Sequence, residues 1–215
     1  MLKPYALLFD WDNTLVDSWK AVQHALNQTL TEYGHPTWTL AEIKVRCVHS
    51  AKDLFPAIFQ ESWQQAYDFF YQHITACHLK HLKPLVYALE LLAFVSSQGI
   101  PMAIVSNKRT DILQREIDHL GWRSFFKVIV GSGDAPSDKP SPAPILLALD
   151  RMNLKPSLHH WYIGDALTDW QSAIASGCQP VALWADPLSL KSKLSFCVPY
   201  IKDCHELYRK VSDFL

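Results

Sequence analysis

Five short apolar runs, each followed by glycine or polar residues, constrain the fold of this 215-residue chain more than any other feature. Between the later runs, apolar residues recur every three or four positions, which is the period of a helix packed on one face. Strands that alternate with helices form a parallel sheet covered on both faces. We therefore predict an α/β fold with a doubly wound, Rossmann-like parallel sheet. The predicted strands are residues 5–9, 102–105, 127–130, 160–163 and 180–184.

The connection between the first two predicted strands is much longer than a parallel crossover requires. It contains two stretches of helical period, at residues 16–33 and 63–77. We predict an inserted α-helical cap at residues 16–82, between the two parts of a catalytic core at residues 1–15 and 83–215.

The helix that returns the chain to the sheet is expected to begin near Pro84 and to end near Gly99. Proline suits the first turn of a helix, where its missing N–H would have no partner inside the helix. Glycine commonly follows the last turn, because it adopts a left-handed backbone without steric cost.

Charge and cysteine content restrict the partners and the compartment. The 20 basic and 21 acidic residues nearly cancel, so no strongly basic character favours a nucleic acid or an anionic membrane as partner. The 5 cysteines never form a C-x-x-C pair, which argues against a disulfide framework or a structural zinc site. We find no signal-peptide core and no apolar run long enough to cross a bilayer. The expectation is a cytoplasmic protein that acts on a small molecule, with its oligomeric state left open.

Polar side chains follow the predicted strands. The first strand is followed by Asp-Trp-Asp-Asn-Thr at residues 10–14, at the sheet edge where open α/β sheets bind ligands. Ser106 and Asn107 follow the second strand, Lys139 precedes a helix, and an aspartate pair lies within residues 165–169. Each segment alone has a plainer explanation, such as a helix cap or a solvated charge. Their joint occurrence at strand ends indicates a functional site.

In this arrangement the chain resembles the haloacid dehalogenase superfamily of phosphohydrolases over residues 5 to about 185. Its four motifs match residues 10–14, Ser106, Lys139 and residues 165–169. The resemblance implies a haloacid-dehalogenase-like sheet with the strand order 3-2-1-4-5.

The stretch at residues 133–142 and the position of the helical cap look most like the phosphoglycolate-phosphatase-like branch. The implied strand order sets Asp10 and Asp165 at neighbouring strand ends. Together these two side chains could hold a divalent ion.

A phosphate monoester is a dianion, so a carboxylate nucleophile approaches it against repulsion. That repulsion is about 4 kcal/mol per charge pair at 4 Å when the effective dielectric is near 20. Attack therefore requires cations. Mg²⁺ prefers oxygen ligands, and Asp10, Asp165 and the main-chain carbonyl of Asp12 are its expected ligands here. Lys139 supplies a second positive charge.

In this reading Asp10 is the nucleophile and forms an aspartyl-phosphate. Asp12 is the general acid for the leaving alcohol and then the base for the attacking water. Dehalogenase members lack an acid at this position, so Asp12 favours phosphoryl chemistry. The side chains expected to bind phosphoryl oxygens are Thr14, Ser106, Asn107 and Lys139.

Asp169 has two readings that the sequence leaves open. It can orient Lys139 or a metal-bound water, or it can be an aspartate that favours a helix N-terminus. Two departures from the family pattern remove no ligand: Trp11 is bulkier than the usual Leu, Met or Phe, and residues 166–168 are an uncommon filler.

The cap segment at residues 44–53 is the expected substrate loop, and it matches no member of known specificity. Arg46, His49 and Lys52 are candidates to contact a polar leaving group, with ordinary surface charge as the alternative.

The sequence thus predicts a Mg²⁺-dependent phosphatase acting on a small phosphate monoester, of unknown identity. Two alternatives remain: a phosphosugar mutase on the same scaffold, and a catalytically inert binding or regulatory protein of the same fold.

Overall fold

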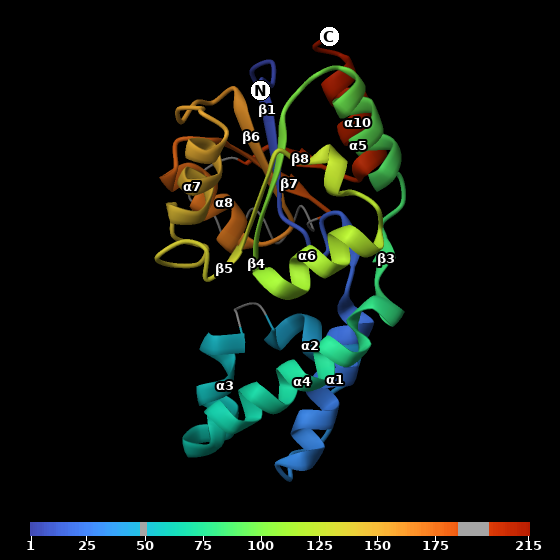
Figure 1. Cartoon of the computed structure of the whole chain (residues 1–215), viewed down its shortest axis with the longest axis vertical. Helices are drawn as coiled ribbons and strands as arrows, with labels where there is room; N and C mark the ends of the chain where they lie inside the picture. Colours follow the sequence, from blue (N-terminus) through green and yellow to red (C-terminus); the bar gives the residue numbers. More distant parts are fainter. Residues whose placement is uncertain (48–50, 185–197) are drawn as a thin grey trace. The chain divides into compact units, whose positions relative to one another are not determined.

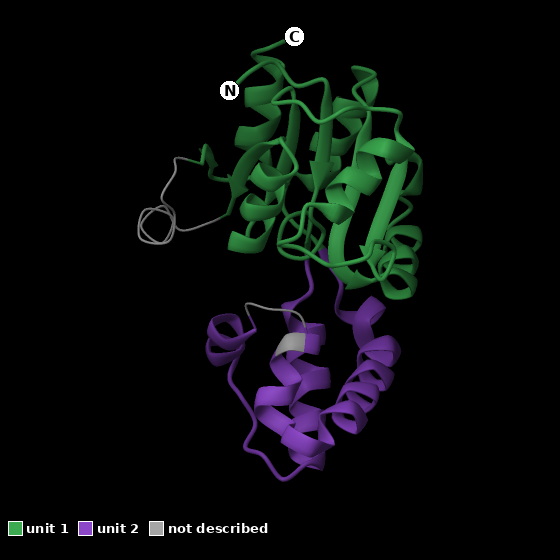
Figure 2. Ribbon diagram, turned by 90° about the vertical axis from the view of Figure 1, so that its left-hand side faces the viewer, with its two compact units in different colours: residues 1–16, 84–215 green, residues 17–83 purple. Residues whose placement is uncertain are grey.

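The computed structural model describes residues 1–47, 51–184 and 198–215. The chain divides into two compact units, Met1–Val16 with Pro84–Leu215 and Asp17–Lys83 (Figure 2). Each division lies one residue beyond the domain boundary that we expected from the sequence. Where the chain passes between the units, the short strands β2 (Val16–Asp17) and β3 (Lys83–Pro84) pair with each other.

The first unit is built on a six-stranded parallel sheet in the order β5-β4-β1-β6-β7-β8 (Figure 1). The five predicted strands are all present in the expected order 3-2-1-4-5, and β8 adds a sixth strand at one edge. The strands are β1 (Ala6–Phe9), β4 (Met102–Arg109), β5 (Val128–Ser132), β6 (His160–Gly164), β7 (Gln179–Leu183) and β8 (Tyr200–Ile201).

Helices cover both faces of this sheet, and for this reason its central strands are apolar throughout. The helices α7 and α8 lie on one side, and α5 and α10, which pack on each other, lie on the other (Figure 1). Every residue of β1 is fully buried. The helices in the described part of this unit are α5 (Ala88–Ser97), α6 (Thr110–His119), η2 (Arg123–Phe125), α7 (Ala143–Arg151), α8 (Leu167–Ala175) and α10 (Cys204–Ser212).

Two expectations at the ends of the inserted segment are wrong. Pro84 lies in β3 and not in a helical turn; α5 begins at Ala88, after Tyr87 with a φ of 65°. The residue before a proline is pushed toward extended backbone, which suits Lys83 to a strand. Val16, the first apolar position of the predicted stripe, likewise lies in β2.

The second unit is helical, as expected for the inserted segment. Its elements are α1 (Trp19–Glu32), α2 (Leu40–Arg46), α3 (Ala51–Phe59), η1 (Gln60–Ser62) and α4 (Trp63–His81). The helices α1 and α4 pack on each other. Their buried residues include Leu26 and Leu30 from α1 and Phe70 and Ile74 from α4. Within the described ranges, no helix combines the length and the apolar character needed to cross a membrane.

The segment expected to be a substrate loop from residue 44 is partly helical. Thr39 and Glu42 form a capping box that starts α2, and the helix continues through Lys44 to Arg46. Basic residues in a last turn interact favourably with the helix dipole, so these two cations suit a helix end. Lys52 lies in α3.

Candidate active site

Asp10 and Asp165 lie at the ends of neighbouring strands, as the strand order implied. Phe9 of β1 is in register with Ile163 of β6, and the Asp10 N–H donates to the Ile163 carbonyl at 2.9 Å. One oxygen each of Asp10, Asp165 and Asp169 can be chosen so that all three lie within 4.8 Å of one another. Among the described residues, this is the group of carboxylates suited to hold a metal ion.

The chain turns sharply after Asp10, as two aspartates one residue apart require if both are to face the same centre. Asn13 adopts a left-handed conformation with φ 60°. The Trp11 carbonyl accepts N–H groups from Leu15 at 3.0 Å and from Val16 at 3.3 Å. Asparagine tolerates this backbone better than most residues, so the turn follows from the local sequence.

Lys139 is the best-connected charged group of the site. Its ammonium donates to Asp10 Oδ1 and to Asp169 Oδ1, each at 2.7 Å. It also lies 2.9 Å from the Tyr162 hydroxyl and 3.1 Å from the Val105 carbonyl. The side chain is 3% exposed. An ammonium with four acceptors around it and almost no access to water is held in one position.

The main chain of Lys139 is fixed by Asn107. The Asn107 side chain donates from Nδ2 to the Lys139 carbonyl and accepts at Oδ1 from the Lys139 N–H, both at 2.9 Å. We expected Asn107 to bind a phosphoryl oxygen; in the structure both ends of its amide are engaged with Lys139. These two bonds position that lysine, and the second hydrogen on Nδ2 stays available for the predicted contact with a phosphoryl oxygen.

Asp169 makes both kinds of contact that the sequence left open. Oδ1 accepts from Lys139, while Oδ2 accepts from the Ala166 N–H at 2.9 Å at the start of α8. The carboxylate crosses the end of β6 at Gly164, where a Cβ atom would overlap the Asp169 side chain. The glycine at this strand end is needed for the close approach.

Burial and charge together shape the ionisation of these groups. Burial raises the pKa of Asp10 to about 7, although Lys139 opposes the shift. Burial also raises the pKa of Asp165 well above its usual value, and the charges of Asp169 and Asp10 add to this. Burial alone would lower the pKa of Lys139, but Asp10 and Asp169 outweigh it, and the pKa rises well above its usual value.

Carboxylates outnumber ammonium groups in this buried cluster, since Asp10, Asp165 and Asp169 face Lys139. Like charges out of water repel strongly, and a divalent cation would relieve that repulsion. Carboxylate oxygens are the ligands that Mg²⁺ prefers. The residues present therefore fit a divalent metal.

The two predicted hydroxyl groups belong to Thr14, in the turn after β1, and to Ser106, within β4. Thr14 is fully buried, and its Oγ1 lies 3.4 Å from Asp165 Oδ1. Ser106 is 4% exposed, and its Oγ accepts from the Lys108 N–H at 3.3 Å. Ser106 belongs to β4 and does not follow it, because this strand continues to Arg109 with a register irregularity after Val105.

The sequence did not identify three residues near the site. Tyr162 contacts Lys139 from within β6, and Lys108 Nζ lies 2.7 Å from Asp12 Oδ1 and 2.6 Å from Glu116 Oε2. The position of Lys108, two residues after Ser106, was a usable signal. No feature of the sequence pointed to Glu116, because a glutamate in an amphipathic helix is usually exposed.

The three basic candidates of the helical unit differ in what the structure shows of them. Arg46 lies over the Trp38 ring at 4.5 Å and pairs with Glu42 at 4.0 Å. Lys52 is exposed on α3. His49 is outside the described residues.

Comparison with known proteins defines the class. The family model described as haloacid dehalogenase-like hydrolase matches residues 7–183, so the chain belongs to that family. This confirms the resemblance drawn from the motifs at residues 10–14 and 165–169.

Relatives named phosphoglycolate phosphatase confirm the likeness to that branch. The one from Yersinia pseudotuberculosis is 31% identical over 186 residues, covering 81% of this chain and 78% of the relative. The one from Pectobacterium atrosepticum is 30% identical over 189 residues, covering 82% and 79%.

Solved structures support the fold. A haloacid dehalogenase-like family hydrolase from Streptococcus pneumoniae superposes with a TM-score of 0.85 at 24% identity, covering 100% of both chains. A hydrolase of the same superfamily from Ehrlichia chaffeensis gives 0.69 at 28% identity, covering 100% of this chain and 98% of that one.

Proposed function

We propose that this hydrolase is a Mg²⁺-dependent phosphatase that cleaves a small phosphate monoester through Asp10. The observation that carries the proposal is the Lys139 ammonium, buried 2.7 Å from both Asp10 and Asp169 beside the carboxylate of Asp165. A fixed cation next to a candidate nucleophile is what a reaction between two anions requires.

Asp10 and Asp165, with the main-chain carbonyl of Asp12, would hold the metal. Bound Mg²⁺ supplies positive charge that offsets the repulsion between the phosphoryl oxygens and the attacking carboxylate. Lys139 supplies charge from the protein side, and Asn107 and Asp169 keep it in place.

In the first half of the reaction, an Asp10 carboxylate oxygen bonds to phosphorus as the bond to the ester oxygen breaks. Asp12 gives its proton to the departing oxygen, which leaves as an alcohol. Thr14 and Ser106 donate hydrogen bonds to the phosphoryl oxygens. The product on the protein is an aspartyl-phosphate at residue 10.

In the second half, Asp12 takes a proton from a water molecule. The water oxygen bonds to phosphorus and the bond to Asp10 breaks, so phosphate leaves and the carboxylate is restored. Asp12 ends the cycle protonated, ready for the next ester.

The relatives named phosphoglycolate phosphatase make phosphoglycolate the first ester to test. A reducing, cytoplasmic location belongs to the same proposal, because Cys47, Cys77, Cys178 and Cys204 all carry free thiols. The near balance of charge supports a small-molecule substrate in preference to a polyanion.

The proposal is tested by phosphate release from p-nitrophenyl phosphate with Mg²⁺ and with EDTA, in wild-type and Asp10→Asn proteins. We expect turnover only in the wild type with Mg²⁺. Equal release by both proteins would show that Asp10 is not the nucleophile. Turnover that EDTA does not diminish would show that the reaction does not depend on a metal ion. A panel of phosphate esters, beginning with phosphoglycolate, then identifies the substrate.

Two alternatives have distinct outcomes. A phosphosugar mutase would return the phosphoryl group to a second hydroxyl, so product analysis would show an isomer in place of free phosphate. An inert binding protein would not be stabilised against heat by Mg²⁺ with aluminium or beryllium fluoride, whereas a phosphatase binding this phosphate mimic must be.

A further inference from the structure

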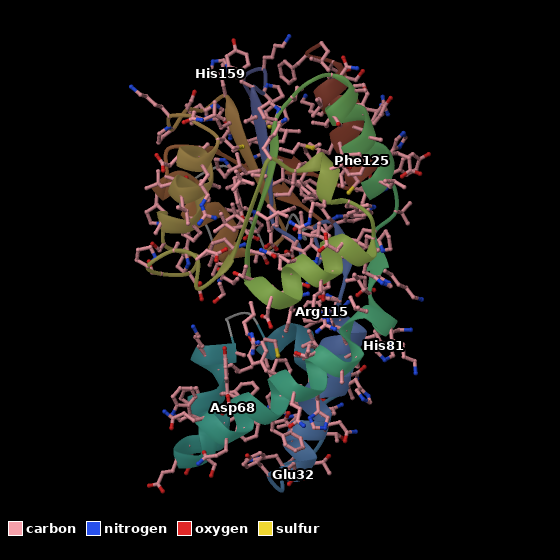
Figure 3. All side chains as sticks on the ribbon, viewed as in Figure 1. Glu32, Asp68, His81, Arg115, Phe125 and His159 are labelled. Atoms are coloured by element: carbon pink, nitrogen blue, oxygen red, sulfur yellow. The ribbon has the colours of Figure 1, made fainter. Side chains whose placement is uncertain are left out.

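Glu116 is a buried carboxylate next to the candidate site with no part in the mechanism above. It belongs to α6, whose buried face otherwise consists of Ile112, Leu113 and Ile117. Its side chain is 1% exposed, while that of the preceding residue, Arg115, is exposed (Figure 3). Burying a carboxylate is costly unless its charge is paired and hydrogen-bonded.

The partners of Glu116 lead directly to Asp12. One oxygen, Oε2, accepts from the Trp11 indole Nε1 and from the Lys108 ammonium, each at 2.6 Å. The same ammonium donates to Asp12 Oδ1 at 2.7 Å. We call the series Trp11, Glu116, Lys108 and Asp12 the Glu116 network.

Burial decreases along the Glu116 network from Trp11 to Asp12, which indicates that the buried residues hold the more exposed ones in place. Trp11 is fully buried and meets Trp122 edge-on, with ring centroids 5.9 Å apart. Glu116 is as buried as Trp11, Lys108 is 12% exposed and Asp12 is 26% exposed. A lysine side chain has many rotamers, and one partly exposed carboxylate holds it weakly. A second, buried carboxylate therefore anchors the Lys108 ammonium.

We propose that Glu116 is a positioning residue for Asp12 and acts through Lys108. The inference rests on the proposed function, because it concerns the residue that would protonate the leaving group. It also gives a reason for the tryptophan between the two aspartates: its indole N–H holds Glu116, which a Leu, Met or Phe could not do.

The test removes the acceptor without adding charge. Glu116→Met lacks the oxygen that holds Lys108, while Glu116→Gln keeps an oxygen there without the negative charge. The readout is kcat/KM on p-nitrophenyl phosphate and on the alkyl phosphate that the wild type hydrolyses fastest. This ratio reports formation of the aspartyl-phosphate, whereas kcat also includes hydrolysis of that intermediate, which is the same for both esters. An alkyl leaving group must receive a proton as it departs, whereas p-nitrophenolate is stable enough to leave with little assistance from an acid.

We expect Glu116→Met to lower kcat/KM on the alkyl ester by about tenfold and on the aryl ester by less than about threefold, a part of the usual effect of acid catalysis. Glu116→Gln should lie between this variant and the wild type. Asp118→Asn is the matched control: it removes an exposed carboxylate from the same helix, paired with Arg123, and should change neither rate. Equal losses on both esters would overturn the proposal.

A double-mutant cycle tests whether the effect passes through Lys108. In a Lys108→Met background, Glu116→Met should leave the ratio of alkyl to aryl kcat/KM unchanged, because the connection is already broken. If the second substitution lowers the ratio by the same factor as in the wild type, Glu116 does not act through Lys108.

A structural readout does not depend on activity. Crystal structures of the wild type and Glu116→Met should show Lys108 Nζ within hydrogen-bond distance of Asp12 Oδ1 only in the wild type. An unmoved lysine would overturn the proposal. If the wild type hydrolyses no phosphate ester, the proposed function fails, and this comparison still decides whether Glu116 positions Lys108. Should thermal unfolding show that Glu116→Met does not fold, Glu116→Gln serves in both measurements.

Discussion

The Lys139 ammonium lies 2.7 Å from Asp10 Oδ1, although the two residues are 129 positions apart in the sequence. The same ammonium reaches Asp169, so one lysine orients carboxylates that follow two different strands. The nucleophile proposed here is thus fixed by a residue that the chain supplies much later, and the site forms only when β1, β4 and β6 lie together.

Removing the Lys139 ammonium should cost stability as well as activity. Lys139→Met leaves Asp10 and Asp169 buried without their shared cation, and breaking a buried pair in this way costs about 3–5 kcal/mol. Urea denaturation measures the loss. The control is Lys127→Met, at an exposed lysine, where we expect a change within about 0.5 kcal/mol. A Lys139→Met protein as stable as the control would show that the carboxylates do not depend on the lysine.

Asp12→Asn should separate esters by their leaving groups. The amide cannot supply a proton, so hydrolysis of alkyl esters should slow by about 10² to 10⁴, while p-nitrophenyl phosphate should suffer less. Substrate binding should be largely retained, since Asp12 is not expected to hold phosphoryl oxygens. The values of kcat/KM for both esters measure the difference, because they report the step in which the leaving group departs. Equal losses would argue against the role of Asp12 as an acid.

The metal-free protein should lose stability between about pH 4 and pH 7. Burial raises the pKa of Asp10 from 3.8 to about 7, so over this interval the folded state binds the proton more tightly than the unfolded chain. The free energy of unfolding therefore falls as pH rises through this range. The raised pKa of Asp165 acts in the same direction.

Thermal unfolding in EDTA at pH 5 and pH 8 measures this effect. Asp10→Asn, which has no carboxyl group at this position, should show a smaller decrease. Mg²⁺ should stabilise the wild type more at pH 8 than at pH 5, because it competes with protons for the same oxygens. An Asp10→Asn protein with the pH dependence of the wild type would contradict this account.

The sheet could be predicted because its strands are short, apolar and separated by helices. Once the sheet was predicted, the position of the candidate site at the strand ends could be inferred as well. The wrong or missing predictions concern short segments of the chain. The residue type of Pro84 suits either a first helical turn or an extended segment, and only the pairing of β3 with β2 decides between them. The strand β8, two residues long, has too few residues to show any periodicity.

The contacts that position charges were the least predictable part of the site. Tyr162 looks like any apolar residue of a buried strand, and Glu116 like any polar residue of an amphipathic helix. Each is recognisable only once packing turns it toward a lysine. Asn107 was found, but its amide contacts the main chain of Lys139, which no spacing in the sequence reveals.

Gly164 carries no functional group, yet the position of Lys139 depends on what this residue lacks. A single added methyl group there would push Asp169 away from the end of β6, and the lysine would lose one of its two carboxylate partners. We therefore expect Gly164→Ala to weaken the hold on Lys139, although residue 164 contributes no side chain to the site.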